Sequence, residues 1–103
     1  GLRLNARSLG SNYSGTINIA TNDDYIENTS GNTLTLVLPS PANVPGKFMF
    51  IRNTNGTINI TPSGTMIYGT NTTSSAPIAN GDTKLRLLVS TDASRWIYQI
   101  IGD

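Results

Sequence analysis

The side chains that could do chemistry in this chain of 103 residues are its carboxylates, because the sequence contains no histidine and no cysteine. Their absence excludes Ser-His and Cys-His catalysis and the zinc sites built on either residue. The carboxylates belong to Asp23, Asp24, Glu27, Asp82, Asp92 and Asp103. Glycoside hydrolysis needs two of them across a cleft. Asp23, Asp24, Asp82 and Asp92 all fall in predicted turns, where aspartate is favoured because it bonds its own backbone. We therefore predict that the chain is not an enzyme.

A calcium site is the second chemistry to weigh, because hard cations prefer clustered oxygen ligands. Asn22, Asp23, Asp24 and Glu27 supply such oxygens over six positions. Their spacing matches no known calcium loop, so we interpret the segment as a solvated turn. The sequence predicts neither a metal nor a cofactor.

The distribution of charged residues indicates which classes of partner the chain can bind. Seven lysines and arginines are spread among six acids, giving a formal net charge of +1. Nucleic-acid binders need clustered cations to neutralise phosphates, and the sequence has no basic stripe. Its apolar stretches are also far shorter than the roughly 20 residues of a membrane-spanning helix. We expect neither nucleic-acid binding nor membrane insertion.

The elements that must position any binding residue are short strands, since apolar residues alternate with polar ones and no helical period is present. The predicted strands are 2–5, 16–21, 25–28, 33–38, 47–52, 57–61, 65–68, 84–90 and 95–101. The segment 69–75 is either an exposed loop or an edge strand. Asn55-Gly56 indicates a hairpin between 47–52 and 57–61, and the strand 47–52 is expected to be covered on both of its sides.

These features predict an all-β domain, an antiparallel β-sandwich or jelly roll of eight or nine short strands with no significant helix. We place the head domain at 16–103 and interpret 1–15 as a connecting segment, a possible junction with a shaft. The chain begins without methionine, and we expect it to be a fragment of a longer polypeptide. Exposed strand edges in so small a domain favour pairing with other chains.

The order of turns and core residues resembles a module of bacteriophage tail-fibre and spike proteins and of some large DNA viruses. The matching steps are Asp24-Tyr25, Leu38-Pro39, Gly46-Lys47, Ile51-Arg52-Asn53, Ile60 to Gly64, Ile67 to Thr70, Leu88 to Asp92 and Arg95 to Tyr98. The resemblance implies a fibre head on the virion surface, usually a homotrimer, that attaches to a glycan or protein receptor of the host cell. In that module the aromatic after the final turn closes the core, so we expect Trp96 to be packed inside.

The receptor-binding residues are expected in two loops, 53–56 and 69–75, and beside them. The candidates are Arg52, Asn53, Asn55, Tyr68, Asn71, Thr72 and Arg95. Two alternatives remain open. The domain could be a structural trimerisation or decoration domain of a capsid or tail, or a monomeric carbohydrate-binding module.

Overall fold

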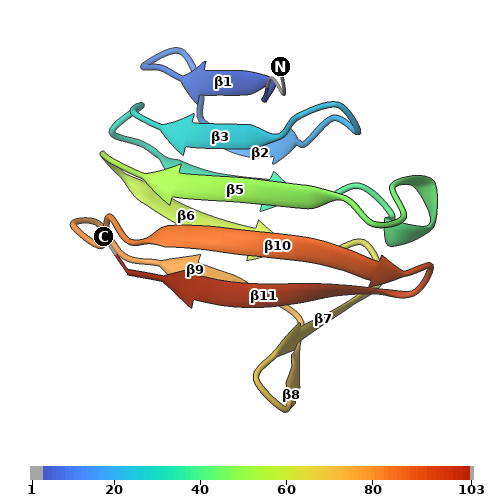
Figure 1. The fold of residues 1–103 in the computed structure, drawn as a ribbon. Helices are drawn as coiled ribbons and strands as arrows, with labels where there is room; N and C mark the ends of the chain where they lie inside the picture. Colours follow the sequence, from blue (N-terminus) through green and yellow to red (C-terminus); the bar gives the residue numbers. More distant parts are fainter. Residues whose placement is uncertain (1–3, 103) are drawn as a thin grey trace.

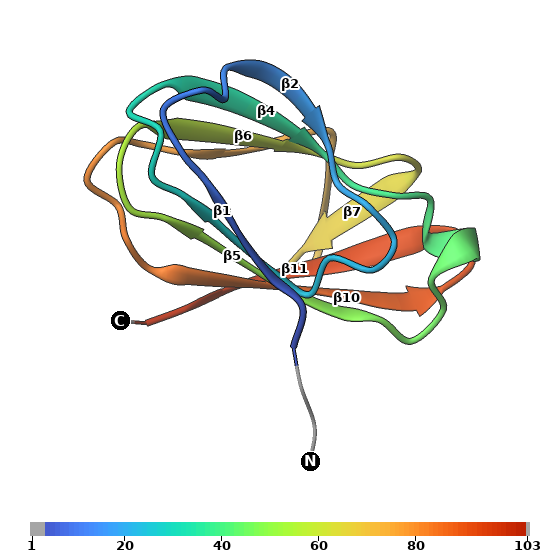
Figure 2. The same ribbon diagram turned by 90° about the horizontal axis from the view of Figure 1, so that it is seen from above.

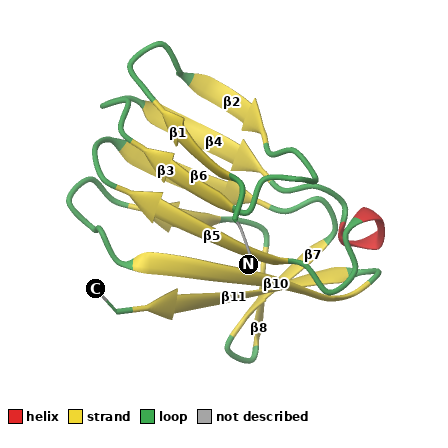
Figure 3. Cartoon of the chain, turned by 45° about the horizontal axis from the view of Figure 1, so that its top comes forward, coloured by secondary structure: helices red, strands yellow, loops and turns green. Residues whose placement is uncertain are grey.

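The computed structural model describes residues 4–102, and β-strands make up most of them (Figure 1). The strands are β1 (Ala6–Leu9), β2 (Gly15–Asn18), β3 (Tyr25–Asn28), β4 (Thr33–Val37), β5 (Phe48–Asn53), β6 (Thr57–Thr61), β7 (Thr65–Tyr68), β8 (Asn71–Thr73), β9 (Ala76–Ile78), β10 (Leu85–Asp92) and β11 (Arg95–Ile101). Within the described residues, helical structure is limited to a 3-10 turn, η1 (Pro41–Asn43), in the β4–β5 connection (Figure 3). The predicted all-β class is confirmed.

The strands form two sheets that face each other (Figure 2). Sheet A has seven strands in the order β1-β3-β5-β10-β11-β7-β8, and sheet B has four in the order β2-β4-β6-β9. Most strands alternate buried and more exposed positions, as in Thr33–Val37 and Thr57–Thr61. The period of two therefore sends one set of side chains from each sheet into a shared interior.

Buried apolar side chains from both sheets fill this interior. The buried apolar residues are Leu9, Ile19, Ile26, Leu34, Leu36, Leu38, Val44, Met49, Ile51, Ile58, Ile60, Met66, Ala76, Ile78, Leu88, Trp96 and Tyr98. Trp96 is fully buried, and its Nε1 donates a hydrogen bond to the Pro39 carbonyl at 3.0 Å. The expected packing of Trp96 in the core is confirmed.

The first six strands do not pair as hairpins. They alternate between the sheets, so β1, β3 and β5 are parallel neighbours in sheet A, and β2, β4 and β6 are parallel neighbours in sheet B. The chain thus winds through three stacked coils. The predicted antiparallel pairing is wrong for this half, and so is the predicted hairpin at Asn55-Gly56, because that turn passes from β5 in sheet A to β6 in sheet B.

The second half closes the stack mainly with antiparallel pairs, although β7 pairs with β11 in parallel. β10 pairs with β5 and β11, and β9 pairs with β6. The hairpin predicted for the last two strands is therefore confirmed. β7 and β8 form a hairpin at the end of sheet A that projects beyond the body of the domain (Figure 1). The segment 69–75 contains β8, so the edge-strand alternative is correct.

The N-terminal segment is part of the same domain. β1 pairs in register with β3, and Leu9 is fully buried in the core. Its neighbour Arg7 lies at an inward register position and reaches Asp23 at 2.8 Å. The interpretation of 1–15 as a connecting segment is corrected for residues 4–15, because they complete the first coil; residues 1–3 lie outside the described part.

Candidate functional site

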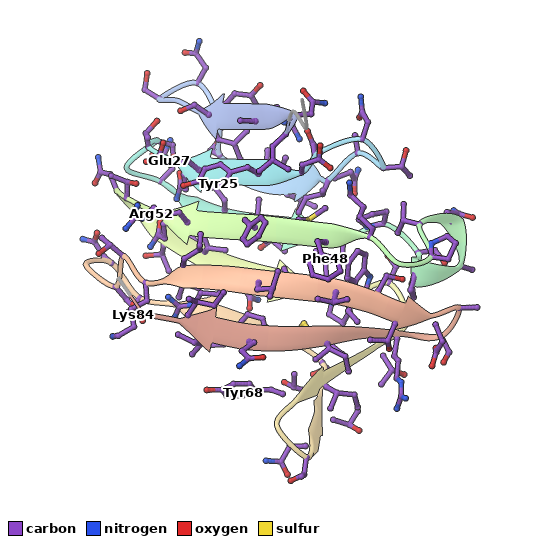
Figure 4. All side chains as sticks on the ribbon, in the orientation of Figure 1. Tyr25, Glu27, Phe48, Arg52, Tyr68 and Lys84 are labelled. Carbon is purple, nitrogen blue, oxygen red and sulfur yellow. The ribbon has the colours of Figure 1, made fainter. Side chains whose placement is uncertain are left out.

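The outer face of sheet A is unusually apolar. The apolar residues at its outward positions are Tyr25, Phe48, Phe50, Leu85, Leu87, Val89, Ile97 and Ile101, here called the apolar face; the polar Gln99 lies among them as the register partner of Leu87. Tyr25, Phe50 and Leu87 are register partners on neighbouring strands, and Phe48, Val89 and Ile97 form a second such row. Phe48 is 57% exposed and stands on the open side of the sheet (Figure 4).

The outer face of sheet B has the opposite character. Its outward positions on β2, β4 and β6 are Thr16, Asn18, Thr33, Thr35, Val37, Thr57, Asn59 and Thr61. Hydroxyl and amide groups on a strand surface are well solvated, whereas the largest contiguous apolar patch on a domain is often functional. The outer face of sheet B therefore suits contact with water, and the outer face of sheet A suits contact with another apolar surface.

Charged side chains border one end of the apolar face. Glu27 and Arg52 are register partners on β3 and β5, and Lys84 precedes β10 (Figure 4). Within the described residues, neither Glu27 nor Arg52 forms a salt bridge: Glu27 accepts a hydrogen bond from the Thr54 hydroxyl, and Arg52 Nε donates to the Thr83 carbonyl at 3.1 Å. A carboxylate and a guanidinium without a salt bridge among the described residues thus lie on neighbouring strands at this rim.

A second surface lies where β11 runs past the end of β7. β7 pairs with β11 from Arg95 to Tyr98, and β8 pairs with β7 alone. Two hollows open beside Tyr68, one of about 420 Å³ and one of about 140 Å³, and both are lined by Tyr68, Tyr98 and Ile100. The first is completed by Gly69, Ile97 and Gln99, and the second by Thr73, Ser75, Ala76 and Pro77. The two hollows together are called the Tyr68 notch.

The aromatic pair in this notch is fixed by a hydrogen bond from the buried Arg86 to Tyr98. The rings of Tyr68 and Tyr98 meet edge to face, with centroids 5.3 Å apart. Tyr98 is buried, which raises the pKa of its hydroxyl, and that oxygen accepts a hydrogen bond from Arg86 Nε at 3.1 Å. Arg86 is itself 2% exposed and binds the Asp82 carboxylate through two nitrogens, at 2.8 and 3.1 Å. The position of the Tyr98 ring is therefore fixed, and the exposed Tyr68 packs against it.

The buried Arg86 also sets the charge state of its partner. Its guanidinium holds the pKa of Asp82 at about 2, and Asp82 in turn raises the pKa of Arg86. A two-nitrogen contact of this kind is strong because both bonds are charge-assisted. Asp82 thus acts on the notch indirectly, by fixing Arg86, which in turn binds Tyr98.

The other described carboxylates are engaged in similar contacts. Asp23 accepts bonds from Arg7 and the Ala20 amide, and Asp24 pairs with Lys47 at 2.6 Å, which lowers the pKa of Asp24. Asp92 accepts bonds from Ser94 and Arg95. Asp103 lies outside the described residues. No group of three acidic side chains suited to a metal ion occurs within residues 4–102, and Asn22 to Glu27 forms a turn and a strand there.

The seven predicted receptor-binding residues do not form one site. Tyr68 lies in the notch, and Asn71 and Thr72 are on the neighbouring β8, exposed but outside both hollows. Arg52 and the exposed Asn55 lie at the end of β5, whereas Arg95 begins β11 at the opposite end of the sheet (Figure 1).

Asn53 needs a correction. It is 1% exposed, and its Nδ2 donates to the carbonyls of Gly56 and Ala79 at 2.9 and 3.2 Å. Its side chain stabilises the turn from inside and does not reach the surface. Gln99, in contrast, was not predicted, although it is exposed beside Tyr68. Its alternation on the last strand placed it on an outward face, but no sequence feature linked it to Tyr68.

Comparison of the chain with protein-family models, with curated proteins and with solved structures finds no match. Within residues 4–102, no helix is long and apolar enough to cross a membrane.

Proposed function

We propose that this domain is the head of a fibre on the surface of a virus or bacteriophage, and that three copies associate through the apolar face. The assembled head attaches the particle to a glycan or protein of the host cell. The observation that carries the assembly is the contrast between the apolar outer face of sheet A and the threonine and asparagine surface of sheet B. The attachment role is supported by the resemblance of the turn and core residues to fibre-head modules.

The size of the apolar face suits a protein contact. Four strands about 4.8 Å apart and about 20 Å long cover roughly 400 Å² in plan. This is the size of the largest apolar patch on many monomeric domains, and such patches are often functional. Phe48 is the natural centre of such a contact, because a large exposed aromatic ring gains the most from burial. The single chain leaves the outer side of the strand 47–52 open at Phe48, contrary to the expected cover on both sides, and a second copy on this face would supply that cover.

The charged rim favours a copy of the same chain as the partner. Glu27 and Arg52 carry opposite charges, lie at one level of the face and lack ion-pair partners within the described residues. Another copy would bring its own Arg52 and Glu27, so one surface supplies both halves of a complementary contact. Such pairs set orientation more than affinity.

Association also explains how weak contacts could hold a particle. Linked copies bind a surface with an avidity far above that of one site, provided the sites engage together. A structural trimerisation or decoration domain would use the same face without a receptor. A monomeric carbohydrate-binding module would leave the face exposed.

The test is the mass of the chain in solution by light scattering. We expect a mass near three times 11.0 kDa, and we expect Val89→Glu to give monomers because it buries a charge in the contact. Val37→Glu is the matched control: it changes the same residue type at an outward strand position of sheet B, and it should leave the mass unchanged. A monomeric wild-type chain, or equal effects of the two substitutions, would contradict the proposed assembly.

A further inference from the structure

We infer that the Tyr68 notch is a binding site for a neutral saccharide. This inference rests on the proposed attachment function and names its ligand class and its site. The larger hollow, at about 420 Å³, lies within the range of small-molecule sites, roughly 300–1,000 Å³. Aromatic and aliphatic side chains line it together with a few polar groups, the usual composition of such sites.

The chemistry of the lining selects the ligand class. None of the ten residues that line the two hollows is charged. A phosphate, a sialic acid or a sulfated sugar would find no cation there to bind its charge. The polar residues available are Thr73 and Ser75 in the smaller hollow and Gln99, which lines the larger hollow from the outward side of β11, and their hydroxyls and amide suit the hydroxyls of a neutral sugar.

Tyr68 supplies the apolar half of the recognition. It is 47% exposed, it lies below β11 in the view of Figure 4, and it lines both hollows. The C–H face of a pyranose ring is apolar and packs on the negative face of an aromatic ring. Arg86 fixes Tyr98 through a hydrogen bond, and the edge-to-face contact with Tyr98 orients Tyr68 in the unliganded chain. A preorganised ring loses little conformational freedom on binding.

A saccharide fits this place better than a peptide strand. Beyond Tyr98, the edge of β11 facing the notch has no strand paired to it within the described residues. This open edge comprises Gln99, Ile100 and Ile101, which is shorter than the roughly four to eight residues of an ordinary strand. It offers backbone groups for a few hydrogen bonds to sugar hydroxyls, but too little length to align a peptide.

All the residues of the notch come from one chain, and two of them, Ile97 and Gln99, also lie on the outer face of sheet A that carries the apolar face. In an assembled head it would lie at the margin of the contact between copies. Several notches would then be presented together, which turns weak single-site binding into avidity.

The experiment uses an array of neutral, sialylated and sulfated glycans, followed by titration of a neutral hit in solution. We expect binding to neutral glycans, and we expect Tyr68→Ala and Gln99→Ala to weaken the solution affinity at least about tenfold. Tyr68→Phe should retain most of it because the ring remains. Asn71→Ala is the control on the same hairpin, since Asn71 lines neither hollow, and its affinity should equal that of the wild type.

The outcomes separate this inference from the proposed assembly. In Val89→Glu, loss of association should reduce binding to the array but leave the solution affinity for one sugar unchanged. An array without neutral hits, or binding that survives Tyr68→Ala, would overturn the saccharide site even if the wild type is a trimer. A monomeric wild type that binds neutral glycans through Tyr68 would keep the site and overturn the assembled head. Melting curves of the variants exclude misfolding as the cause of a loss.

Discussion

Asn28 donates a hydrogen bond from its Nδ2 to the Oδ1 of Asn53 across 3.1 Å, and both side chains are buried. The two residues are register partners on β3 and β5, at the point where each coil turns from sheet A to sheet B. The Oδ1 of Asn28 accepts bonds from the amide and hydroxyl of Ser30. Stacked asparagines of this kind form ladders between parallel strands, and this one joins the second coil to the third.

The ladder predicts a large loss of stability when its inner member is truncated. Asn53→Ala should lower the free energy of unfolding by about 2 kcal/mol or more, because the carbonyls of Gly56 and Ala79 and the amide of Asn28 lose their partner in the interior. Urea denaturation measures the loss. Asn55→Ala, two residues on and exposed, should change the value by no more than about 0.5 kcal/mol. Equal effects at the two positions would show that the ladder is not a stabilising feature.

The turn after Asn53 should tolerate no side chain at Gly56. This glycine has a φ of +114°, and a Cβ there would lie 2.4 Å from the backbone oxygen of Asn32. Gly56→Ala combines backbone strain with a clash against a neighbouring coil, and we expect a loss of about 3 kcal/mol or more. In Gly10→Ala the new Cβ would meet no atom within 4 Å, and that variant should unfold near the wild-type midpoint. Wild-type stability of Gly56→Ala in thermal and urea unfolding would mean that the coils do not approach as described.

The Asp82–Arg86 pair predicts how stability depends on acid. The pKa of Asp82 is about 2 in the folded chain, against an ordinary value of 3.8. Between these values the unfolded chain binds more protons than the folded one, so this contribution is present above about pH 4 and is lost as the pH falls toward 2. Asp82→Asn should therefore flatten the dependence of unfolding free energy on pH in this window.

Asp92 provides the contrast for that measurement. Its pKa is also lowered, chiefly by hydrogen bonds from Ser94, but the pair it forms with Arg95 is exposed at both partners. Exposed pairs are screened by salt and contribute little. Salt should therefore weaken the effect of Asp92→Asn by screening the Arg95 contribution, although the Ser94 hydrogen bonds remain, whereas the effect of Asp82→Asn should persist at high salt because Arg86 is buried. Identical profiles for the two variants would contradict a special role of the buried guanidinium.

Much of the local structure could be predicted from the sequence. The strands Tyr25–Asn28, Thr57–Thr61, Thr65–Tyr68 and Arg95–Ile101 occur within the predicted bounds. The inward faces were also correct, for example Leu34 and Leu36 on β4. These features depend on alternation and on turn residues, which act over a few positions.

The pairing partners were missed, although the sequence holds a signal for them. Gly-Thr-Ile-Asn-Ile occurs at 15–19 and again at 56–60, and Asn-Thr-x-Gly occurs at 28–31 and at 53–56. A repeated unit of about 20 to 25 residues is typical of stacked coils. It would have favoured parallel stacking of β3 on β5 over a hairpin at Asn55-Gly56.

The sequence by itself determined the all-β class, the positions of most strands and the side chains that each strand turns inward. The burial of Trp96 was expected from the resemblance to fibre-head modules, and the structure confirms it. Only the tertiary structure decided that the first three coils pair in parallel, that Asn53 is buried and that Tyr68 meets Tyr98 beside Gln99. The physical reason is that alternation specifies which way a side chain points, not which strand lies next to it. That choice depends on contacts between residues distant in the chain, and the apolar face and the notch are both products of it.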